Sequence, residues 1–376
     1  PASFTGEDVA ELHVHGGPAV IAAMLQACLA IDGVRAAEPG EFTRRAFENG
    51  KLDLTEAEGL ADLIEAETEG QRRQALRQMR GALSALYEGW RARLIGAAAL
   101  LEAEIDFPDE DLPGALAKRA GPLLEALASD MDRHLQDAHR GERVRDGYCI
   151  AIIGPPNAGK SSLLNALARR EAAIVSEIPG TARDVVQVRV ALAGFPVWIA
   201  DTAGLREAAD SIEAEGVRRA LERAEEADLR LGVAEAASQP PAALLACMKP
   251  GDVLIRSKPD LTEPGSVRLE DWAAGPVVPV SAVTGQGLAE LEALLSQNVT
   301  DALAREEAPA LTRVRHRQLV ADAREALGRS IVALDQGAEL AAEDVRRAAW
   351  AIGRLTGRVD VEDLLDEIFS RFCIGK

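Results

Sequence analysis

Aromatic residues and cysteines are scarce in this chain of 376 residues: aromatics make up 3% of it, and there are four cysteines. So few rings argue against a platform on which single-stranded bases stack. The cysteines lie far apart and form no CxxC pair, so neither a zinc site nor a disulfide framework is indicated, and we expect a reducing, cytoplasmic location. They are Cys28, Cys149, Cys247 and Cys373.

Long apolar runs and an excess of positive charge are missing as well. No run approaches the roughly 18 residues that span a bilayer, and no signal peptide is visible, so no membrane partner is expected. Lys and Arg number 42 against 61 Asp and Glu, which gives a net charge of −19. This balance excludes a generally basic nucleic-acid binder but not a local basic patch. The candidates for such a patch are Arg44, Arg45, Arg72, Arg73, Arg313, Arg315 and Arg317.

The chain does contain two kinds of secondary-structure pattern. At 47% hydrophobic and 27% charged it has an average globular composition, and its length predicts two to four domains. Residues 52–145 and 301–376 favour helices, whereas residues 146–300 alternate short β-rich runs with helical segments, which is typical of βαβ units and a mostly parallel sheet. We therefore expect an α/β domain inserted between two helical halves that pack together, preceded by a mixed segment, residues 1–51.

Two local patterns refine the helical parts. The spacing of Thr55-Glu56-Ala57-Glu58 predicts a capping box at the start of the first helical stretch. An apolar stripe near the end of the chain indicates the buried face of a helix. Its members are Leu364, Leu365, Ile368, Phe369 and Phe372.

The segment from Gly154 to Ser161 fits the phosphate-binding pattern G-x-x-x-x-G-K-[ST]. It follows the short apolar run 149–153 and precedes a helical segment, which is the context that the pattern requires. Glycines let backbone N–H groups approach phosphate oxygens, and a helix N-terminus adds partial positive charge. Lys160 is expected to reach the β- and γ-phosphates, and the Ser161 hydroxyl to bind Mg²⁺.

Three further motifs follow in the order expected of a GTP-binding domain. Asp201-Thr202-Ala203-Gly204 can hold Mg²⁺ through water and sense the γ-phosphate. The carboxylate of Ser257-Lys258-Pro259-Asp260 can accept the two N–H donors of the guanine edge, which adenine lacks. A backbone N–H of Ser281-Ala282 can bind the guanine carbonyl. Each motif alone is weak, but the ordered set on alternating strands predicts GTP rather than ATP.

Two departures from the usual GTPase pattern stand out. Ser257 occupies the place of the usual asparagine, and because serine is shorter, a hydrogen bond that braces the loop and the base is expected to be lost, at about 0.5–1.5 kcal/mol. Leu205 occupies the place of the glutamine that positions water in Ras-like enzymes. The water-orienting group must then come from elsewhere, although most of the nearby polar residues also fit a solvated helix face. These are Arg206, Glu207, Asp210, Glu213 and Glu215.

Together with motifs elsewhere in the chain, these segments resemble the MnmE (TrmE) family of tRNA-modifying GTPases. The similar segments are Gly180-Thr181-Ala182-Arg183-Asp184, Asp201 to Glu207 and the terminal Phe372-Cys373-Ile374-Gly375-Lys376, with Phe4 to Asp8, His15 to Pro18 and Lys51 to Leu54 near the start. The resemblance covers the whole chain. It implies a P-loop GTPase domain in residues 146–300, inserted into a helical domain formed by residues 52–145 and 301–376. Residues 1–51 would be the remainder of a truncated α+β domain for folate binding and homodimerisation.

The resemblance also implies how the GTPase works. GTPase domains of this kind are activated by pairing around K⁺, with Asn157, Ser176, Ile178 and Thr181 as the potassium site. Ser161 and Thr181 would bind Mg²⁺, and Glu213 would orient water through a second water. Ala182 replaces a family threonine and has no oxygen to offer Mg²⁺, which affects the expected rate rather than GTP binding. The residues expected to contact GTP are Asn157, Ala158, Gly159, Lys160, Ser161, Ser162, Ser176, Glu177, Ile178, Pro179, Gly180, Thr181, Ala182, Asp201, Thr202, Ala203, Gly204, Ser257, Lys258, Asp260, Ser281 and Ala282.

The modification chemistry implied by the resemblance needs further components. The family uses a tetrahydrofolate one-carbon donor, of 5-formyl or methylene type, and an FAD-dependent partner of MnmG (GidA) type to modify carbon 5 of the tRNA wobble uridine. Glu11, Lys51 and Lys376 would form the folate site, although Glu11 and Lys51 also suit plain surface charges. Cys373 is either a catalytic thiol or a small core residue, and both interpretations stay open.

Three alternatives remain at the level of the sequence. His13-Val14-His15 could suggest metal ligands, but no third ligand is in view, and we prefer ordinary histidines beside a Gly-Gly turn. The chain could be a GTP-switched ribosome-assembly factor without one-carbon chemistry, although that would favour a basic RNA-binding module after the GTPase domain. It could also be a degenerate scaffold, given Ser257 and Ala182.

Overall fold

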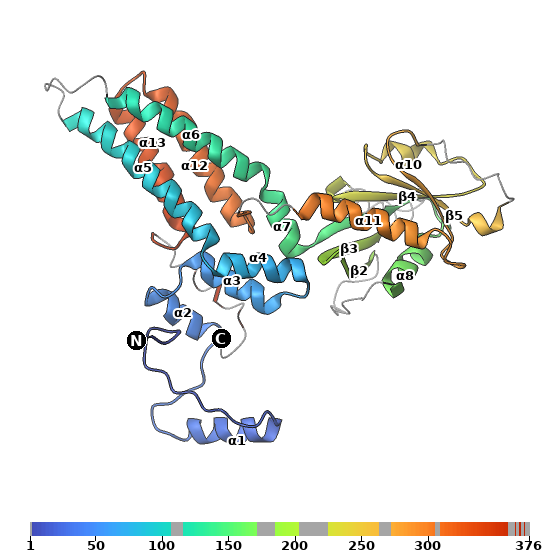
Figure 1. The fold of residues 1–376 in the computed structure, drawn as a ribbon, viewed down its shortest axis with the longest axis horizontal. Helices are drawn as coiled ribbons and strands as arrows, with labels where there is room; N and C mark the ends of the chain where they lie inside the picture. The colour runs from blue at the N-terminus through green and yellow to red at the C-terminus, as the bar shows by residue number, and fades with distance from the viewer. Residues whose placement is uncertain are drawn as a thin grey trace, which may run out of the picture. The chain divides into compact units, whose positions relative to one another are not determined.

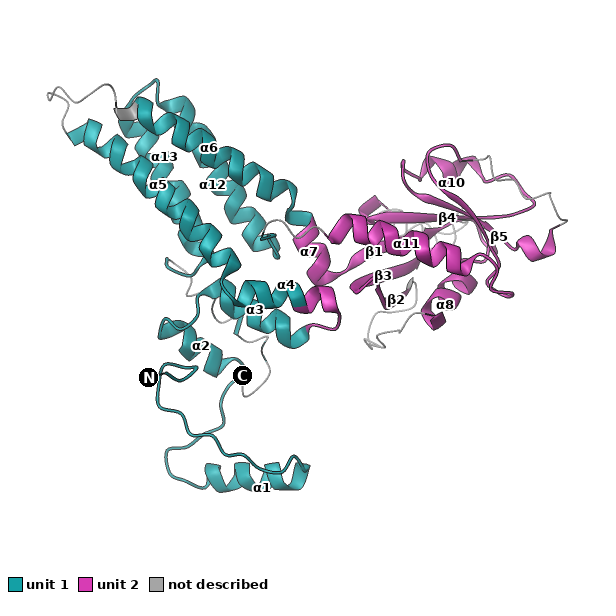
Figure 2. Cartoon of the chain, in the orientation of Figure 1, with its two compact units in different colours: residues 1–65, 73–139, 308–376 teal, residues 66–72, 140–307 magenta. Residues whose placement is uncertain are grey.

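The computed structural model describes residues 2–106, 116–170, 185–202, 225–262, 272–304 and 309–359, together with Leu365, Ile368, Phe369 and Phe372. The chain forms two compact units (Figure 2). Unit 1 consists of residues 1–65, 73–139 and 308–376, and unit 2 of residues 66–72 and 140–307. The chain therefore leaves unit 1, builds most of unit 2 and returns to unit 1, so that unit 2 is an insertion.

Unit 1 is helical (Figure 1). Its helices are α1 (Pro18–Leu29), α2 (Glu41–Glu48), α3 (Leu54–Glu65), most of α4 (Glu69–Met79), α5 (Ala82–Asp106), α6 (Leu116–Gln136), α12 (Val314–Ala333) and α13 (Ala338–Leu355). Among these, α5, α6, α12 and α13 share one hydrophobic core. Buried residues on α5 recur every three or four positions, which is the spacing of one helix face. They are Leu83, Tyr87, Trp90, Leu94, Ala97 and Leu101.

This core confirms the expected packing of the two helical halves, because α5 and α6 precede the insertion and α12 and α13 follow it. A smaller core joins Leu54 and Ala57 of α3 to Leu365, Phe369 and Phe372. The predicted apolar stripe is thus buried at Leu365, Phe369 and Phe372 and half-buried at Ile368, while Leu364 lies outside the described residues.

The capping box at the start of α3 does not lie where the sequence spacing predicts it. The Glu56 backbone N–H donates to Asp53 Oδ1 at 2.9 Å, and the Asp53 N–H donates to Glu56 Oε2 at 2.8 Å. Asp53 is therefore the cap, and the prediction of Thr55 and Glu58 was wrong. The same spacing occurs twice within six residues, and only the folded chain decides between the two.

Glu58 is instead the centre of a buried ion cluster in unit 1, where its side chain is 1% exposed. Its carboxylate lies 2.7 Å from His316 Nε2 and 3.0 Å from Arg315 on α12, and Arg313 also bonds Asp62 at 2.7 Å. Burial alone would raise the pKa of Glu58, but the neighbouring His316 and Arg315 outweigh it and hold the pKa well below its usual range. This cluster ties α3 to α12, two helices on opposite sides of the insertion in sequence.

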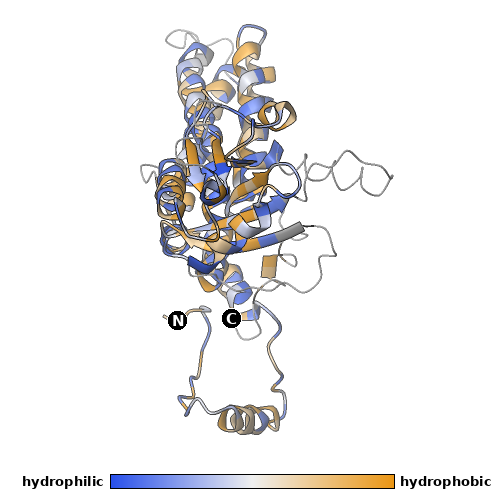
Figure 3. Cartoon of the chain, turned by 90° about the vertical axis from the view of Figure 1, so that its right-hand side faces the viewer, coloured by the Kyte–Doolittle hydropathy of each residue, from blue (hydrophilic) through white to orange (hydrophobic). Residues whose placement is uncertain are grey.

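Helix α1 takes no part in these cores. None of its residues is buried, and Figure 3 colours it almost wholly apolar. Gly17 is the N-cap of α1, and Pro18 is its first residue. Proline suits this position because the N–H group that it lacks would have no partner within the helix. Within the described part of the chain, no helix combines the length and the apolar character needed to cross a membrane.

Unit 2 is built on a six-stranded sheet with the order β2-β3-β1-β4-β5-β6. Its elements are β1 (Tyr148–Ile153), α8 (Lys160–Arg170), β2 (Val185–Leu192), β3 (Phe195–Thr202), β4 (Leu229–Glu235), α10 (Ala242–Ala246), β5 (Val253–Ser257), η1 (Pro259–Leu261), β6 (Val277–Val280) and α11 (Leu288–Leu303), with α7 (Ala138–Asp146) leading into β1. The β2–β3 pair is antiparallel and the four other strand pairs are parallel. The mostly parallel sheet predicted from the sequence is confirmed.

Side chains alternate across this sheet. In β1, Ile150 and Ile152 join a core with α8 and α11, while Ala151 and Ile153 join a second core with Leu244 of α10. Helices therefore cover both faces, as a parallel sheet requires. Because the five strands other than β2 run in one direction, the loops that follow them meet at one edge, where ligands bind in such folds.

Candidate functional site

The turn between β1 and α8 holds its backbone in conformations that glycine permits. Gly154 has φ +156°, and a Cβ there would lie 2.3 Å from the Val233 carbonyl oxygen. Gly159 has φ +95°, and Asn157 adopts a left-handed φ of 62° without being glycine. Left-handed residues of this kind cluster where a function needs the backbone in a fixed shape. The loop therefore needs the glycines that its sequence motif supplies.

Lys160 lies at the first position of α8 and is 6% exposed. Its Nζ donates hydrogen bonds to the carbonyl oxygens of Gly154 at 3.0 Å and Pro155 at 2.9 Å. Burial lowers the pKa of Lys160, and the nearby Asp201 opposes that shift. The ammonium group is thus bonded to the loop that would surround a phosphate chain.

Ser161 and Asp201 meet beside this lysine. The Ser161 hydroxyl donates to Asp201 Oδ2 at 2.6 Å. The other carboxylate oxygen, Oδ1, is buried and has no hydrogen-bond partner among the described residues. A buried, unpartnered oxygen next to a hydroxyl fits the all-oxygen coordination that Mg²⁺ prefers. Thr181, the second predicted magnesium ligand, lies outside the described residues.

A cavity of about 190 Å³ opens at the same edge of the sheet. Part of its lining is apolar and comes from Val233 of β4, Ile255 of β5 and Val280 of β6. Asp260 of η1 supplies the carboxylate, and the loop after β6 supplies Ser281 and Ala282. The Ser281 N–H already donates to the Gln286 carbonyl at 3.0 Å, which leaves the Ala282 amide as the candidate donor to a base carbonyl. An apolar slot with one carboxylate at its rim suits a planar base with paired N–H groups.

Ser257 makes the hydrogen bond that the sequence analysis expected it to lose. Its hydroxyl lies 2.6 Å from the Ala158 carbonyl oxygen in the phosphate loop and 3.3 Å from that of Ala234. The expectation of a missing loop brace was therefore wrong, because the end of β5 comes close enough to the loop for a short side chain. The loss of a hydrogen bond to the base stays a prediction.

Sequence reasoning did not single out Glu235 as a site residue. This last residue of β4 lies 2.5 Å from Lys258 Nζ, which also donates to the Asn157 carbonyl at 2.7 Å. Lys258 has a left-handed φ of 55°. An acidic residue at the end of a parallel strand, on the edge that carries the other motifs, is a signal that could have found it.

Several predicted site residues fall outside the described part of the chain. They are Ser176, Glu177, Ile178, Pro179, Gly180, Thr181, Ala182, Ala203, Gly204, Glu213, Cys373 and Lys376. Thr202 ends β3. Of the expected folate residues, Glu11 pairs with His13 at 3.6 Å, and Lys51 is exposed in the turn after α2. Their role in a folate site stays a prediction. Within the described ranges no group of three or more His, Cys, Asp or Glu side chains suits a metal ion.

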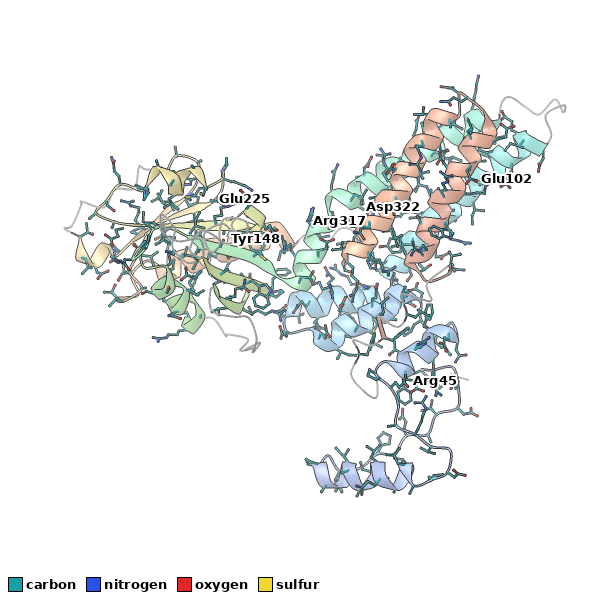
Figure 4. All side chains as sticks on the ribbon, turned by 180° about the vertical axis from the view of Figure 1, so that it is seen from behind. Arg45, Glu102, Tyr148, Glu225, Arg317 and Asp322 are labelled. Atoms are coloured by element: carbon teal, nitrogen blue, oxygen red, sulfur yellow. The ribbon has the colours of Figure 1, made fainter. Side chains whose placement is uncertain are left out.

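The candidate basic patches are largely engaged with carboxylates. Arg313 and Arg315 face Glu58 and Asp62 in the buried cluster. Arg45 of α2, labelled in Figure 4, bonds Glu41 and Glu7 at 2.7 and 3.0 Å. The remaining pairs are Arg44 with Glu48 and Arg72 with Glu69. Neighbouring carboxylates therefore offset much of the positive charge that these arginines would offer to a nucleic acid.

Comparison with known proteins places the whole chain. A family model described as the MnmE helical domain matches residues 54–373, and one described as the GTP-binding protein TrmE N-terminus matches residues 1–51. The chain belongs to the MnmE family. The tRNA modification GTPases MnmE of Parvibaculum lavamentivorans and Maricaulis maris are each 60% identical to it, over 100% of this chain and 84% of each relative.

A further MnmE protein agrees with this assignment. MnmE of Caulobacter vibrioides is 53% identical over 100% of this chain and 85% of that protein. The G domain of the T. maritima FeoB iron transporter is 26% identical, covers 42% of this chain and 99% of that one, and has a TM-score of 0.32. The MnmE relatives show that the chain is a GTPase of this family. Its phosphate-binding loop, between β1 and α8, lies in unit 2.

Proposed function

We propose that this MnmE-family chain hydrolyses GTP in a potassium-stimulated reaction that serves the modification of carbon 5 of the tRNA wobble uridine. The observation that supports it best is the meeting of Lys160, Ser161 and Asp201 beside a cavity that ends in Asp260. The names of its relatives, which are tRNA modification GTPases, support the RNA substrate.

In this reaction the chain's own residues bind and orient the triphosphate. Lys160 exchanges its two loop carbonyls for β- and γ-phosphate oxygens, so that its charge opposes the charge that develops there. Ser161 and Asp201 hold Mg²⁺, which neutralises phosphate charge when bound. Asp260 accepts the N–H groups of guanine. Glu213 orients the attacking water, because Leu205 has no group that can.

A second cation completes the proposal. Asn157, with Ser176, Ile178 and Thr181, would hold K⁺, which brings the positive charge that an arginine finger supplies in other GTPases. Pairing of two GTPase domains would close this site. A homodimer formed through residues 1–51, a tetrahydrofolate derivative at Glu11, Lys51 and Lys376, and an FAD-carrying partner of MnmG type would complete the modification system in the cytoplasm.

Replacing NaCl by KCl is expected to raise GTP turnover by about tenfold or more, because a cation that stabilises the charge of the transition state lowers the activation free energy by several kcal/mol. Steady-state phosphate release at equal ionic strength measures it. Asn157→Ala should keep GTP binding and lose the stimulation. Equal rates in the two salts would contradict the proposal and favour a GTP-switched assembly factor or a degenerate scaffold.

The Asp260→Asn variant is expected to lose GTP affinity by about 100-fold or more and to accept xanthosine triphosphate, because a site built on hydrogen bonds rejects a base that leaves them unmade. An amide N–H can meet the carbonyl that xanthine has in place of the guanine amino group. Competition binding with both nucleotides checks this. Unchanged GTP preference in the variant would remove Asp260 from base recognition.

A further inference from the structure

We propose that His316 makes the junction of α3 and α12 sensitive to acid: as a neutral ring it donates a hydrogen bond to Glu58, and a second proton on the ring would open the junction. The proposal concerns unit 1 and does not depend on the nucleotide site. It starts from the distance of 2.7 Å between His316 Nε2 and Glu58 Oε2, both of them on buried side chains.

The hydrogen in this contact belongs to the histidine. Arg315 at 3.0 Å and Arg313 at 3.5 Å keep Glu58 ionised, and an ionised carboxylate only accepts hydrogen bonds. Nε2 therefore carries the N–H, and Nδ1 is the ring nitrogen that would take a second proton. Nδ1 is buried and has no hydrogen-bond partner among the described residues. Protonation would thus create a buried donor without an acceptor, which costs free energy.

A second proton would also upset the balance of charge around the ring. On α3, Glu58 and Asp62 supply two negative charges. On α12, Arg313 bonds Asp62 at 2.7 Å and Arg315 bonds Glu58 at 3.0 Å, which supplies two positive charges. With His316 neutral the cluster has no net charge. A charged ring would leave it with one buried positive charge that no carboxylate offsets.

The other helices around the ring add no charge that could offset a proton. Tyr87 of α5 meets the His316 ring edge-on, and burial raises the pKa of Tyr87 far above its usual range, so it stays neutral. From α13 the contact is the Arg354 carbonyl, which accepts a hydrogen bond from Arg315 at 3.2 Å. The Arg354 guanidinium lies over the Trp350 ring.

These costs fix the sign of the pH dependence. Burial lowers the pKa of His316 in the folded chain, and Glu58 offsets only part of that shift. The unfolded chain binds the proton near pH 6.5, whereas the folded chain does not. The stabilisation by the neutral ring is therefore complete above about pH 6.5. Below that, the folding equilibrium constant falls by about tenfold for each pH unit, until the folded pKa is reached.

Opening of the junction should reach beyond the histidine. Leu54 and Ala57, on the same helix α3, pack with Phe369 and Phe372 in the smaller core of unit 1. The Leu54 N–H also donates to the Thr356 carbonyl after α13 at 3.2 Å. Acid is therefore expected to loosen α3, the start of α12 and this smaller core together.

The test compares the full parent chain with His316→Gln in urea at about pH 7.5 and 5.5. Glutamine can donate an amide N–H to Glu58 but cannot take a charge in this range. Over this interval the unfolding equilibrium constant of the parent is expected to rise about tenfold more than that of the variant, which is the effect of one proton with an unfolded pKa near 6.5. His13→Gln is the matched control, because His13 is exposed, and it should keep the pH dependence of the parent.

Hydrogen exchange, corrected for the intrinsic rate at each pH, should place the change in α3 and the first turn of α12. Equal pH dependence of the parent and His316→Gln, or a change confined to unit 2, would overturn the proposal. If His316→Gln does not fold, nitrogen NMR of the histidine rings in the parent decides, with the four other histidines replaced one at a time for assignment. The His316 ring should keep its hydrogen on Nε2 and stay neutral at about pH 5.5, and a ring that titrates near pH 6.5 in the folded chain would contradict the proposal.

Discussion

Lys160→Ala is expected to weaken GTP and GDP binding by about 10²–10⁴-fold and to abolish measurable hydrolysis. Lys160 is buried at the start of α8 and donates two hydrogen bonds to the loop carbonyls of Gly154 and Pro155. When phosphate oxygens take the place of these carbonyls, each bond becomes charged on both sides, and such bonds are worth about 1.5–3 kcal/mol. The loss of two such bonds accounts for the expected weakening, because about 1.4 kcal/mol corresponds to a tenfold change in the dissociation constant.

Equilibrium titration with a fluorescent GDP analogue checks this expectation. Lys249→Ala is a suitable control, because Lys249 is exposed and precedes β5, at the opposite end of the strand from the cavity. It should bind nucleotide like the parent. If Lys160→Ala took up nucleotide normally, the loop between β1 and α8 would not be the phosphate site, and the roles proposed for Ser161, Asp201 and Ser257 would lose their basis.

The sequence predicted the elements of this site well because each motif carries its own local cause. Gly154 and Gly159 are required by positive φ, and the apolar run before them can only be a buried strand. Parallel strands then bring Asp201, Asp260 and the Ala282 loop to one edge without further information. For these residues, position along the chain determines position in space.

The prediction was wrong where the result depends on distances between strands. Serine is shorter than asparagine, but only the structure shows that β5 ends within reach of the Ala158 carbonyl. Likewise, Arg313 and Arg315 look like a basic patch in the sequence, because nothing local reveals that Glu58, more than 250 residues earlier, lies among them. The predicted capping box began two residues too late for a similar reason. Nothing in the local sequence shows that the Glu58 carboxylate bonds His316 and Arg315 instead of the helix N-terminus.

Glu58→Gln is expected to lower the free energy of unfolding of unit 1 by about 3–5 kcal/mol, the cost of leaving buried charges without their counter-charge. The glutamine has nearly the same shape, so packing of α3 is retained and the loss reports the charge. Arg315 and His316 would stay buried and would face one neutral amide oxygen in place of a charged carboxylate. The pairing of α3 with α12 across the insertion should weaken first.

Chemical denaturation gives the size of this effect, and hydrogen exchange of the α12 amides places it in unit 1. Glu48→Gln is the control, since the Arg44–Glu48 pair is 41% and 53% exposed and should contribute about 1 kcal/mol or less.

The pH dependence gives an independent check. Because folding lowers the pKa of Glu58, its contribution is complete above about pH 4.3 and is lost as the pH falls toward the folded value. The difference between parent and variant should therefore shrink on acidification. A difference below 1 kcal/mol at neutral pH, or one that grows in acid, would show that the cluster does not hold the two helical halves together.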